Sequence, residues 1–439
     1  MPSKVRPSSG NNKTRQEPTS RLSFVPFLLI SSVLVVTLAI LSLRALPRLS
    51  LLSNHFFPLT TTTTTTLFSS STSSKNSSAM STYAKELEVA QLAVQRASIL
   101  TKRVFHEKAK GTVDKNDKSP VTIGDFGAQA LIIAALRHHF PDDEIVAEEE
   151  AAQLRSEPQL RDQIFDLVKT TQLDDAAAEA SLGGGIASAE SMMDIIDQGN
   201  SKGGAAGRIW AIDPIDGTKG FLRGGQYAVC LALMVDGDVK VGVLGCPNLP
   251  VDDKAPLAAD IGSNANDDTG YGVIFSAVLG QGATSRPLRT GAIATTSDGA
   301  GSIAMKPVTD LSAATFCESV EAGHSAHDDQ AQIAAKLGIT KPSVRMDSQS
   351  KYGSIARGAG DIYLRLPVKA TYQEKIWDHA AGDLIVREAG GQVTDIQGKR
   401  LDFAVGRTLA NNKGVIAAPA AVHGEVLKVV QEVLSSKSS

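Results

Sequence analysis

Residues 210–218 carry two carboxylates whose spacing suits metal binding. In the segment Trp-Ala-Ile-Asp-Pro-Ile-Asp-Gly-Thr, Asp213 and Asp216 follow an apolar, strand-like run and lie three positions apart. Pro214 restricts the backbone between them, and Gly217 permits a tight turn or a close approach to a ligand. Carboxylate oxygens on such a turn are the ligands that hard divalent cations such as Mg²⁺ prefer. The alternative is a surface turn, because Asp, Pro and Gly all favour turns.

Carboxylates in three other segments could join this pair. Asp125 starts a helix predicted over 124–139, Glu148 opens a run of three glutamates, and Asp378 opens a helix predicted over 378–389. Each also has a simpler interpretation: compensation of helix charge, a solvated acidic face and a helix N-cap, respectively. If these acids converge on one cleft, their mutual repulsion requires cations. That arrangement is typical of a metal-dependent phosphoryl site.

Specific motifs add a resemblance to these observations. Residues 213–218 (Asp-Pro-Ile-Asp-Gly-Thr), 377–382 (Trp-Asp-His-Ala-Ala-Gly) and 388–391 (Glu-Ala-Gly-Gly) resemble the paired signatures of the inositol monophosphatase-like superfamily of lithium-sensitive, Mg²⁺-dependent sugar phosphatases. The resemblance covers roughly residues 80–435. One branch, the fungal and plant 3′(2′),5′-bisphosphate nucleotidases, is similar in five further segments: 119–125, 217–223, 323–325, 347–349 and 372–378.

The resemblance implies a fold and a reaction. The implied fold is a mixed α+β and α/β structure, a five-layered αβαβα sandwich of two subdomains with the active site between them. We expect these subdomains over 80–303 and 304–439. The implied reaction is hydrolysis of the 3′-phosphate of adenosine 3′,5′-bisphosphate to AMP and phosphate, with 3′-phosphoadenylyl sulfate as a related substrate. Such an enzyme serves sulfur assimilation and is inhibited by Li⁺ or Na⁺.

The resemblance also implies the roles of individual residues. Asp125 and Thr218 would be catalytic and would orient the attacking water. Two or three Mg²⁺ ions would be held by Asp125, Glu148, Asp213, the main-chain carbonyl of Ile215, Asp216 and Asp378. Substrate contacts would fall on Thr218, His324, Ser348, Lys351, Arg365 and Asp378. The simpler interpretations are loop or cap residues for His324 and Ser348, and surface solvation for the two basic side chains.

Physical chemistry supports a metal-dependent phosphatase independently of the resemblance. A phosphate monoester is an anion, so an acidic pocket repels it unless bound metals invert the local field. Metals also hold the phosphoryl oxygens and lower the pKa of a bound water, so no side-chain nucleophile is required. Lys351 and Arg365 could neutralise a second phosphate. Two alternatives remain: a phosphatase for inositol phosphates, and a membrane-tethered nucleotide sensor without catalysis.

Composition excludes several classes of protein. The chain has 439 residues, of which 42% are hydrophobic and 21% charged, as in ordinary globular proteins. The net charge of −3 argues against a nucleic-acid binder, which usually shows a basic footprint. Three cysteines, Cys230, Cys246 and Cys317, lie in or beside apolar runs, so we expect core residues and no disulfide framework. We expect the catalytic body to be monomeric.

The charge is divided between a basic leader and an acidic body. Residues 1–79 carry eight Lys and Arg and one Glu, for a charge of +7, whereas the remainder carries −10. After a basic tail over 1–21, residues 22–43 contain no charge and could form a helix of about 33 Å, enough to cross a bilayer core. We favour a single-pass signal anchor. A mitochondrial targeting segment and a cytoplasmic protein that starts at Met80 are the alternatives.

Local patterns predict the elements around the candidate site. Residues 44–79, with seven consecutive threonines, form a low-complexity linker. Apolar residues recur every three or four positions from Leu87 to Val104, which predicts an amphipathic helix. Residues 227–244 read as a strand, an Asp-Gly turn and a second strand, which predicts a hairpin. Residues 250–303 are rich in Gly, Asp, Ser and Thr, which favours long loops.

Overall fold

Two β-sheets form the framework of the fold, and the larger one comes first in the chain. The computed structural model describes residues 82–109, 119–255, 257, 270–293, 301–320, 326–369 and 371–436, all within one compact unit, Ser73–Ser439. The first two strands run parallel, and each later neighbour runs antiparallel. In the described residues the sheet order is β1 (Glu144–Ala147), β2 (Arg208–Asp216), β3 (Ala228–Val235), β4 (Asp238–Pro250), β5 (Tyr271–Val278), β6 (Ala283–Pro287) and β7 (Gly301–Ile303).

The second sheet is formed by strands that follow the first sheet in the chain. Its order is β11-β12-β10-β8-β9, in which β10 is parallel to β8 and antiparallel to β12. Because the two sheets use separate stretches of chain, we propose 80–303 and 304–439 as the two subdomains. The strands are β8 (Phe316–Glu318), β9 (Val344–Arg345), β10 (Ile362–Arg365), β11 (Gly391–Thr394) and β12 (Val415–Pro419).

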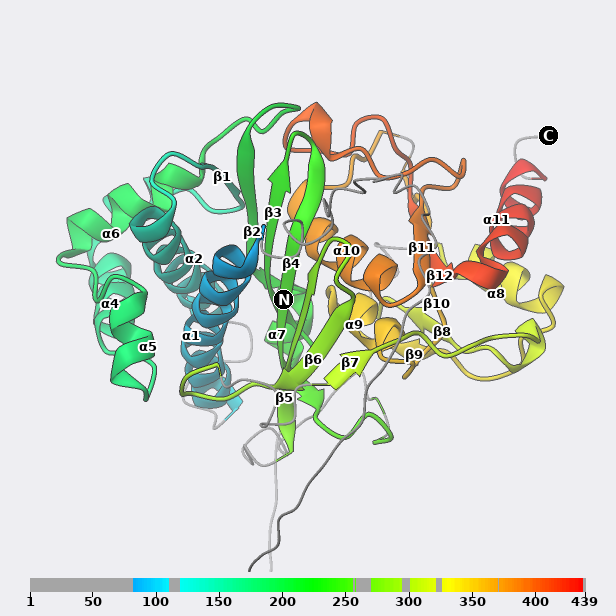
Figure 1. The fold of residues 1–439 in the computed structure, drawn as a ribbon, viewed down its shortest axis with the longest axis horizontal. Coiled ribbons are helices and arrows are strands. Elements are labelled where there is room, and N and C mark those ends of the chain that lie inside the picture. The colour runs from blue at the N-terminus through cyan, green and yellow to red at the C-terminus, as the bar shows by residue number, and fades with distance from the viewer. Residues whose placement is uncertain are drawn as a thin grey trace, which may run out of the picture. The chain divides into compact units, whose positions relative to one another are not determined.

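Helices cover the outer faces of both sheets and fill the space between them (Figure 1). Helices α1 and α2 pack on the first sheet, α9 and α10 contact both sheets, and α11 packs on the second sheet with α8 beside it. This αβαβα order confirms the predicted five-layered fold. The α-helices are α1 (Ala84–Ala109), α2 (Ser119–His139), α3 (Ala152–Ser156), α4 (Pro158–Lys169), α5 (Ala176–Ser181), α6 (Ala189–Ile196), α7 (Thr218–Arg223), α8 (His327–Lys336), α9 (Ser350–Ala356), α10 (Ala380–Glu388) and α11 (Ala420–Ser435). Short 3₁₀ turns are η2 (Asp197–Gly199), η4 (Leu311–Ala313), η5 (Ile376–Asp378) and η6 (Phe403–Val405).

The helix and the hairpin predicted from the hydrophobic spacing are present. The helix expected from Leu87 to Val104 is α1, whose apolar face packs against strands of the first sheet. The hairpin expected over 227–244 consists of β3 and β4. At its turn Asp236 and Gly237 have φ angles of 51° and 77°. Two successive positive φ angles match the right-handed twist of the flanking strands, which is why Asp-Gly is favoured there.

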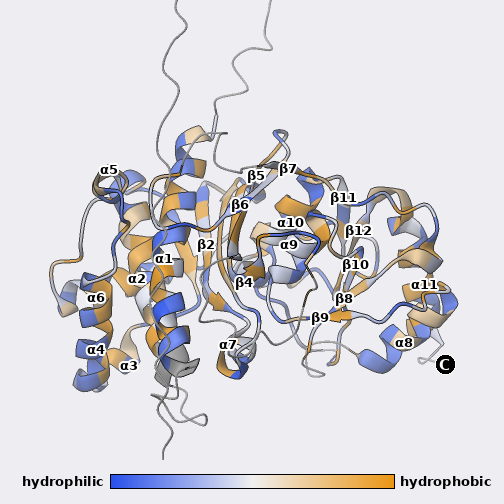
Figure 2. Cartoon of the chain, turned by 90° about the horizontal axis from the view of Figure 1, so that it is seen from below, coloured by the Kyte–Doolittle hydropathy of each residue, from blue (hydrophilic) through white to orange (hydrophobic). Residues whose placement is uncertain are grey.

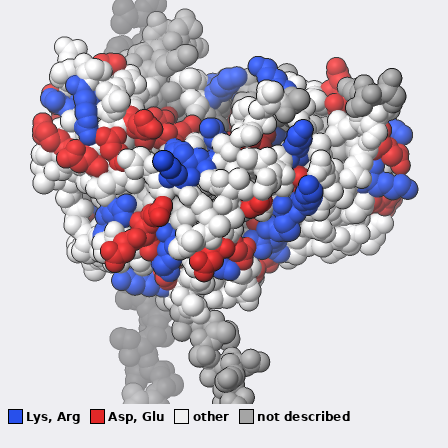
Figure 3. Space-filling model, turned by 90° about the horizontal axis from the view of Figure 1, so that it is seen from above, with Lys and Arg blue, Asp and Glu red and all other residues white. Residues whose placement is uncertain are grey.

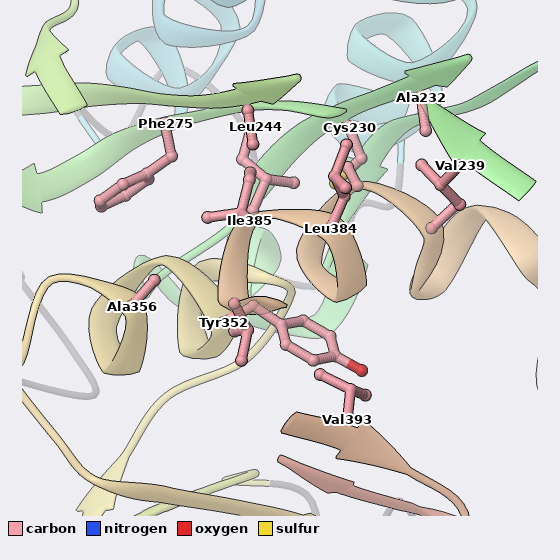
Figure 4. Close-up of a cluster of buried hydrophobic side chains, with 14 of the residues drawn as sticks. Cys230, Ala232, Val239, Leu244, Phe275, Tyr352, Ala356, Leu384, Ile385 and Val393 are labelled. Atoms are coloured by element: carbon pink, nitrogen blue, oxygen red, sulfur yellow. The ribbon is translucent and has the colours of Figure 1, made fainter. Parts of the chain in front are cut away.

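The main hydrophobic core lies between the two sheets and surrounds α10. All residues from Ala380 to Val386 are buried, so the first two turns of this helix are enclosed on every side. In Figure 4, Ile385 of α10 lies beside Leu244 and Leu384 lies beside Cys230 of the first sheet, and apolar residues of α9 and β11 lie on the other side. The outer helices α4 and α8 instead carry hydrophilic residues on their outward surfaces (Figure 2). The three cysteines are buried and unpaired, as predicted: Cys230, Cys246 and Cys317.

The structure corrects the prediction of long loops over 250–303. This stretch contains β5, β6 and β7, and β5 pairs with β4 along most of its length. Ile274 and Phe275 point to opposite faces of the sheet, into different hydrophobic clusters, and both are fully buried. A strand that is buried on both faces shows no polar alternation, and the surrounding Gly, Ser and Thr obscured its apolar run.

The described surface carries both signs of charge. On the face shown in Figure 3, acidic and basic side chains are interspersed, as is usual for solvated surfaces. The described residues include no helix that is long and apolar enough to span a bilayer. The basic tail 1–21, the hydrophobic segment 22–43 and the linker 44–79 lie outside the described residues.

Candidate active site

A cavity of about 230 Å³ lies at the end of β2, beside the start of α7. The structure brings most of the predicted site residues to its wall: Glu148, Asp213, Ile215, Asp216, Thr218, Ser348, Lys351, Arg365 and Asp378. Four further lining residues were not predicted: Gly217, Lys219, Asp347 and Tyr372. Asp125 is not part of the lining, and His324 lies outside the described residues.

The pairing of β1 with β2 brings two acids of the site together. The strands are parallel, and Ala147 pairs with Ile212, so Glu148 and Asp213 follow at the same edge of the sheet. Strand β2 continues to Asp216, with an irregular register against β3 between its two aspartates. The carboxylates therefore lie within an irregular strand end and not on a separate turn. Gly217 has a φ of 89°, a conformation that glycine adopts without strain.

The position of Asp125 differs from the prediction. Helix α2 begins at Ser119, so Asp125 lies in its second turn and does not start it. Its carboxylate is buried, and Oδ1 has no hydrogen-bond partner. Burial raises the pKa of Asp125 well above its usual value, and the charges of Glu149 and Glu148 raise it further. The residue therefore faces the acidic site from behind the lining and does not compensate helix charge.

Asp378 also has a different local structure from the predicted helix start. It closes the 3₁₀ turn η5, and α10 begins two residues later with His379 at the N-cap position. The His379 side chain makes no capping hydrogen bond to α10. The Asp378 carboxylate lines the cavity, 3.8 Å from the Nη2 atom of Arg365. The N-cap interpretation of Asp378 is therefore wrong, and its carboxylate is directed to the site.

The site carboxylates repel one another in a poorly solvated environment. Burial raises the pKa of Asp213 well above its usual value, and the charges of Glu148, Asp216, Asp378 and Asp125 add to the shift. Burial and the neighbouring Glu149 raise the pKa of Glu148 to about 7. Such shifts mean that the ionised forms are unstable together without added positive charge.

A divalent cation would satisfy this group of acids. Oδ1 of Asp125 and Oδ1 of Asp213 are both buried without a hydrogen-bond partner, although buried polar atoms usually have one. Carboxylate and carbonyl oxygens form the donor set that Mg²⁺ prefers. The residues present therefore fit the predicted metal on structural grounds.

Two basic side chains line the same cavity as the acids. Lys351 is only 2% exposed, and its Nζ donates hydrogen bonds to the carbonyl oxygens of Ser348 and Met346, at 2.9 and 3.2 Å. Burial lowers the pKa of Lys351 to about 8. Arg365 is held by Glu374, with 2.7 Å between its Nε and the carboxylate Oε2. Neither side chain is a solvated surface group, so the simpler interpretation is wrong for both.

The two hydroxyl groups of the site differ in exposure, because Thr218 is exposed and Ser348 is buried. Ser348 has a φ of 69°, and its Oγ accepts a hydrogen bond from the backbone of Ser350. Thr218 opens α7, and its Oγ1 lies 3.5 Å from the carbonyl oxygen of Ile215. The pairing of Thr218 with Asp125 that the resemblance implies stays a prediction.

Gln349 was not predicted, yet it links three parts of the site. Its backbone N–H donates to Oδ2 of Asp216. Its side chain donates to the carbonyl oxygen of Trp377 at 2.7 Å and accepts from the N–H of Gly382 at 2.9 Å. One buried residue thus connects Asp216 of β2 with the segment around Asp378. The sequence carries one signal for this residue: the segment 347–349 resembles the nucleotidase branch, but the resemblance implies no role for the glutamine.

A buried chain of polar residues supports Arg365. The Nε2 atom of His379 lies 3.3 Å from Glu374, and its Nδ1 is 2.8 Å from the Tyr352 hydroxyl. Burial would raise the pKa of Glu374, but the hydrogen bond with His379 and the charge of Arg365 together lower it to about 2. The carboxylate therefore stays ionised and holds the guanidinium beside Asp378. Sequence spacing could not predict these contacts, because Tyr352, Arg365 and the segment 374–379 are separate parts of the sequence.

The chain is similar to known proteins over most of its length. Residues 83–435 match the model of the Inositol monophosphatase family. A 3′(2′),5′-bisphosphate nucleotidase of Emericella nidulans is 66% identical over 353 residues, which cover 80% of this chain and 99% of the relative. A Schizosaccharomyces pombe protein of the same name is 48% identical over 359 residues, 81% of this chain and 97% of that protein. Among solved structures, Mycobacterium tuberculosis SuhB aligns over 80% of this chain and 97% of its own, with a TM-score of 0.47 and 20% identity.

Proposed function

Because the chain belongs to the inositol monophosphatase family, we propose that it is a phosphatase that removes the 3′-phosphate of adenosine 3′,5′-bisphosphate. The products are AMP and phosphate, and 3′-phosphoadenylyl sulfate is a related substrate, which places the enzyme in sulfur assimilation. The observation that carries this proposal is one cavity lined by clustered acids and, beside them, by Lys351 and Arg365. A substrate with two phosphates suits such a lining: one group would meet the metals and the other would meet the two cations.

The family is metal-dependent, and we assign two or three Mg²⁺ ions to this cavity. Bound Mg²⁺ would neutralise the acids, hold the phosphoryl oxygens and lower the pKa of a bound water. The residues that would hold the ions are Asp125, Glu148, Asp213, the carbonyl of Ile215, Asp216 and Asp378. The buried Oδ1 atoms of Asp125 and Asp213, which have no hydrogen-bond partner, support this assignment.

The chain's own side chains bind and orient the substrate. Lys351 and Arg365 line the same cavity as the acids, where they can bind the second phosphate through charge-assisted hydrogen bonds. Thr218 and Asp125 orient the attacking water in this proposal, and Ser348 and His324 contribute substrate contacts. No side-chain nucleophile is needed, because phosphoryl transfer depends mainly on positioning and on neutralising charge.

Substrate preference tests the proposal. We expect the full-length chain to hydrolyse adenosine 3′,5′-bisphosphate far faster than inositol 1,4-bisphosphate, and we expect millimolar Li⁺ to inhibit it. Phosphate release from both substrates, with K⁺ replacing Li⁺ at equal ionic strength as the control, measures both effects. Faster turnover of the inositol phosphate would favour the inositol phosphatase alternative. Nucleotide binding without Mg²⁺-dependent phosphate release would favour the non-catalytic sensor.

We also propose that residues 22–43 anchor the protein in a membrane. The uncharged length of this segment and the basic residues before it support a signal anchor with a cytosolic N-terminus. In cells that express the full-length chain with a C-terminal tag, we expect the tag to sediment with membranes and to resist added protease until detergent is present. A tag in the mitochondrial or soluble fraction would support a targeting segment or a start at Met80 instead. The monomeric state of the catalytic body stays a prediction.

A further inference from the structure

Arg407 lies on a segment that is paired with the approach to Asp378. The N–H of Ile376 donates to the carbonyl oxygen of Arg407 at 3.2 Å, and the N–H of Leu409 donates to the carbonyl of Glu374 at 2.8 Å. An isolated antiparallel bridge joins residues 375 and 408 between them. The backbone of Arg407 is therefore fixed next to the segment that ends in Asp378.

The side chain of Arg407 reaches to the first sheet. Its guanidinium donates to three main-chain carbonyl oxygens, of Ala147 at 2.6 Å, Ser201 at 2.9 Å and Gly199 at 3.3 Å. Ala147 is the last residue of β1, so the next residue is Glu148. More than two hundred positions of sequence separate Arg407 from each of these acceptors, with separations of 206 to 260. One side chain thus joins the two sheet regions beside the site.

The same guanidinium packs on Trp377, the residue before Asp378. Its carbon lies 4.9 Å from the centre of the indole ring, within the range of a cation–π contact. Trp377 is 5% exposed, so the ring cannot move far from this contact. Arg407 therefore contacts the residue that precedes Glu148 and the residue that precedes Asp378, two acids that line the same cavity from different parts of the chain.

We propose that Arg407 is a positioning residue that sets the separation of Glu148 and Asp378, and thereby the affinity of the site for Mg²⁺. The inference rests on the proposed function, because it assumes that both acids bind the metal. Groups behind metal ligands fix ligand orientation, and their loss typically weakens metal binding about 10- to 100-fold. An arginine suits the role because its planar fork presents several donors at fixed angles and also stacks on aromatic rings.

The charge of Arg407 and the contacts by which it positions the two acids have opposite effects on the affinity for Mg²⁺. A positive group near Glu148 and Glu150 disfavours a cation, so removing the charge alone would tighten Mg²⁺ binding. Removing the contacts that position the two acids would weaken Mg²⁺ binding. A role only in overall stability would lower the melting temperature of the metal-free protein and leave the affinity of the folded protein unchanged. The sign of the change in affinity therefore separates the three roles.

The test is isothermal titration of the full-length chain with MgCl₂ in the absence of substrate. For Arg407→Met, which keeps an apolar stem but loses every donor, we expect the dissociation constant for Mg²⁺ to rise about 10- to 100-fold. Arg407→Lys keeps the charge and one donor group, so we expect partial rescue. Lys375→Met is the matched control: Lys375 lies 5.5 Å from the centre of the same Trp377 ring, and within the described residues its side chain makes no hydrogen bond to the first sheet. Its Mg²⁺ affinity should stay equal or increase.

Each outcome separates this inference from the proposed function. If wild-type protein binds no Mg²⁺, both are overturned. If wild type binds Mg²⁺ and Arg407→Met binds it equally or more tightly, the positioning role is overturned while the proposed function stands. If Arg407→Met does not fold, Arg407→Lys decides: unchanged affinity overturns the proposal, and an affinity reduced at least severalfold supports it.

Discussion

Replacing Asp213 by alanine is expected to reduce turnover of adenosine 3′,5′-bisphosphate about a thousandfold or more. Bound metal contributes several kcal/mol of charge stabilisation in such reactions, and a loss of about 4 kcal/mol corresponds to about a thousandfold in rate. Asp213 is the acid most surrounded by other site acids, and its Oδ1 has no protein partner. Initial rates of phosphate release at saturating Mg²⁺ measure the effect.

The matched control for this variant is Asp194→Ala. Asp194 lies on α6, its side chain is 73% exposed, and it makes a surface ion pair with Arg155 at 3.2 Å. Exposed ion pairs contribute little to stability, so we expect normal turnover from this variant. Asp213→Ala should also melt at or above the temperature of metal-free wild type, because the substitution removes a buried carboxylate that other site acids repel. Turnover within tenfold of wild type would show that Asp213 is not a required ligand.

The second large effect is on stability, and it requires no substrate. We expect Mg²⁺ at about a hundred times its dissociation constant to stabilise the folded protein by about 2.7 kcal/mol, or about 5 °C in melting temperature. In Asp213→Asn we expect this response to Mg²⁺ to disappear, while the metal-free variant melts above metal-free wild type. The physical reason is that an amide keeps the shape of the side chain but removes one charge from a group of mutually repelling acids.

The pH dependence of the metal-free protein gives an independent check. A carboxylate whose pKa is raised by folding binds its proton more tightly in the folded state, so stability falls as pH rises through that range. For Glu148, with a folded pKa of about 7 and an ordinary value of 4.5, stability is lost between these values as the pH rises. Differential scanning fluorimetry in chelator should show this slope in wild type and a smaller one in Asp213→Asn. An equal dependence of the melting temperature on pH in both proteins would contradict the mutual repulsion of the site acids.

Much of this fold could be predicted from local sequence patterns. The spacing of apolar residues identified α1, and the Asp-Gly turn identified the hairpin of β3 and β4, because in both cases local preferences agree with the tertiary structure. Strand β5 was missed because both of its faces are buried, so its sequence lacks the polar alternation of a half-exposed strand. The start of α2 was missed because its first turn contains Pro120, which tolerates a helix start but also suits a loop.

The site was predicted unevenly for a similar reason. Asp213 and Asp216 stand in one motif and could be read directly from the sequence. Gln349 and Arg407 act through contacts with carbonyl groups that are distant in the chain, so no local pattern reveals them. The positions of acids on elements were also hard to predict: Asp378 was expected to open a helix, whereas it ends a 3₁₀ turn. The candidate ligands followed from residue type and from the resemblance, and they stay a prediction. The contacts that support them could be found only in the tertiary structure.

The most direct test of the account is the identity of the products. Purified full-length protein should be incubated with adenosine 3′,5′-bisphosphate, with Mg²⁺ and with chelator in its place, and the products separated by anion-exchange chromatography. We predict one phosphate released for each AMP formed, with the 5′-phosphate retained, and no release in chelator. Release that does not depend on Mg²⁺, or removal of the 5′-phosphate, would contradict a metal-dependent 3′-nucleotidase site between the two sheets.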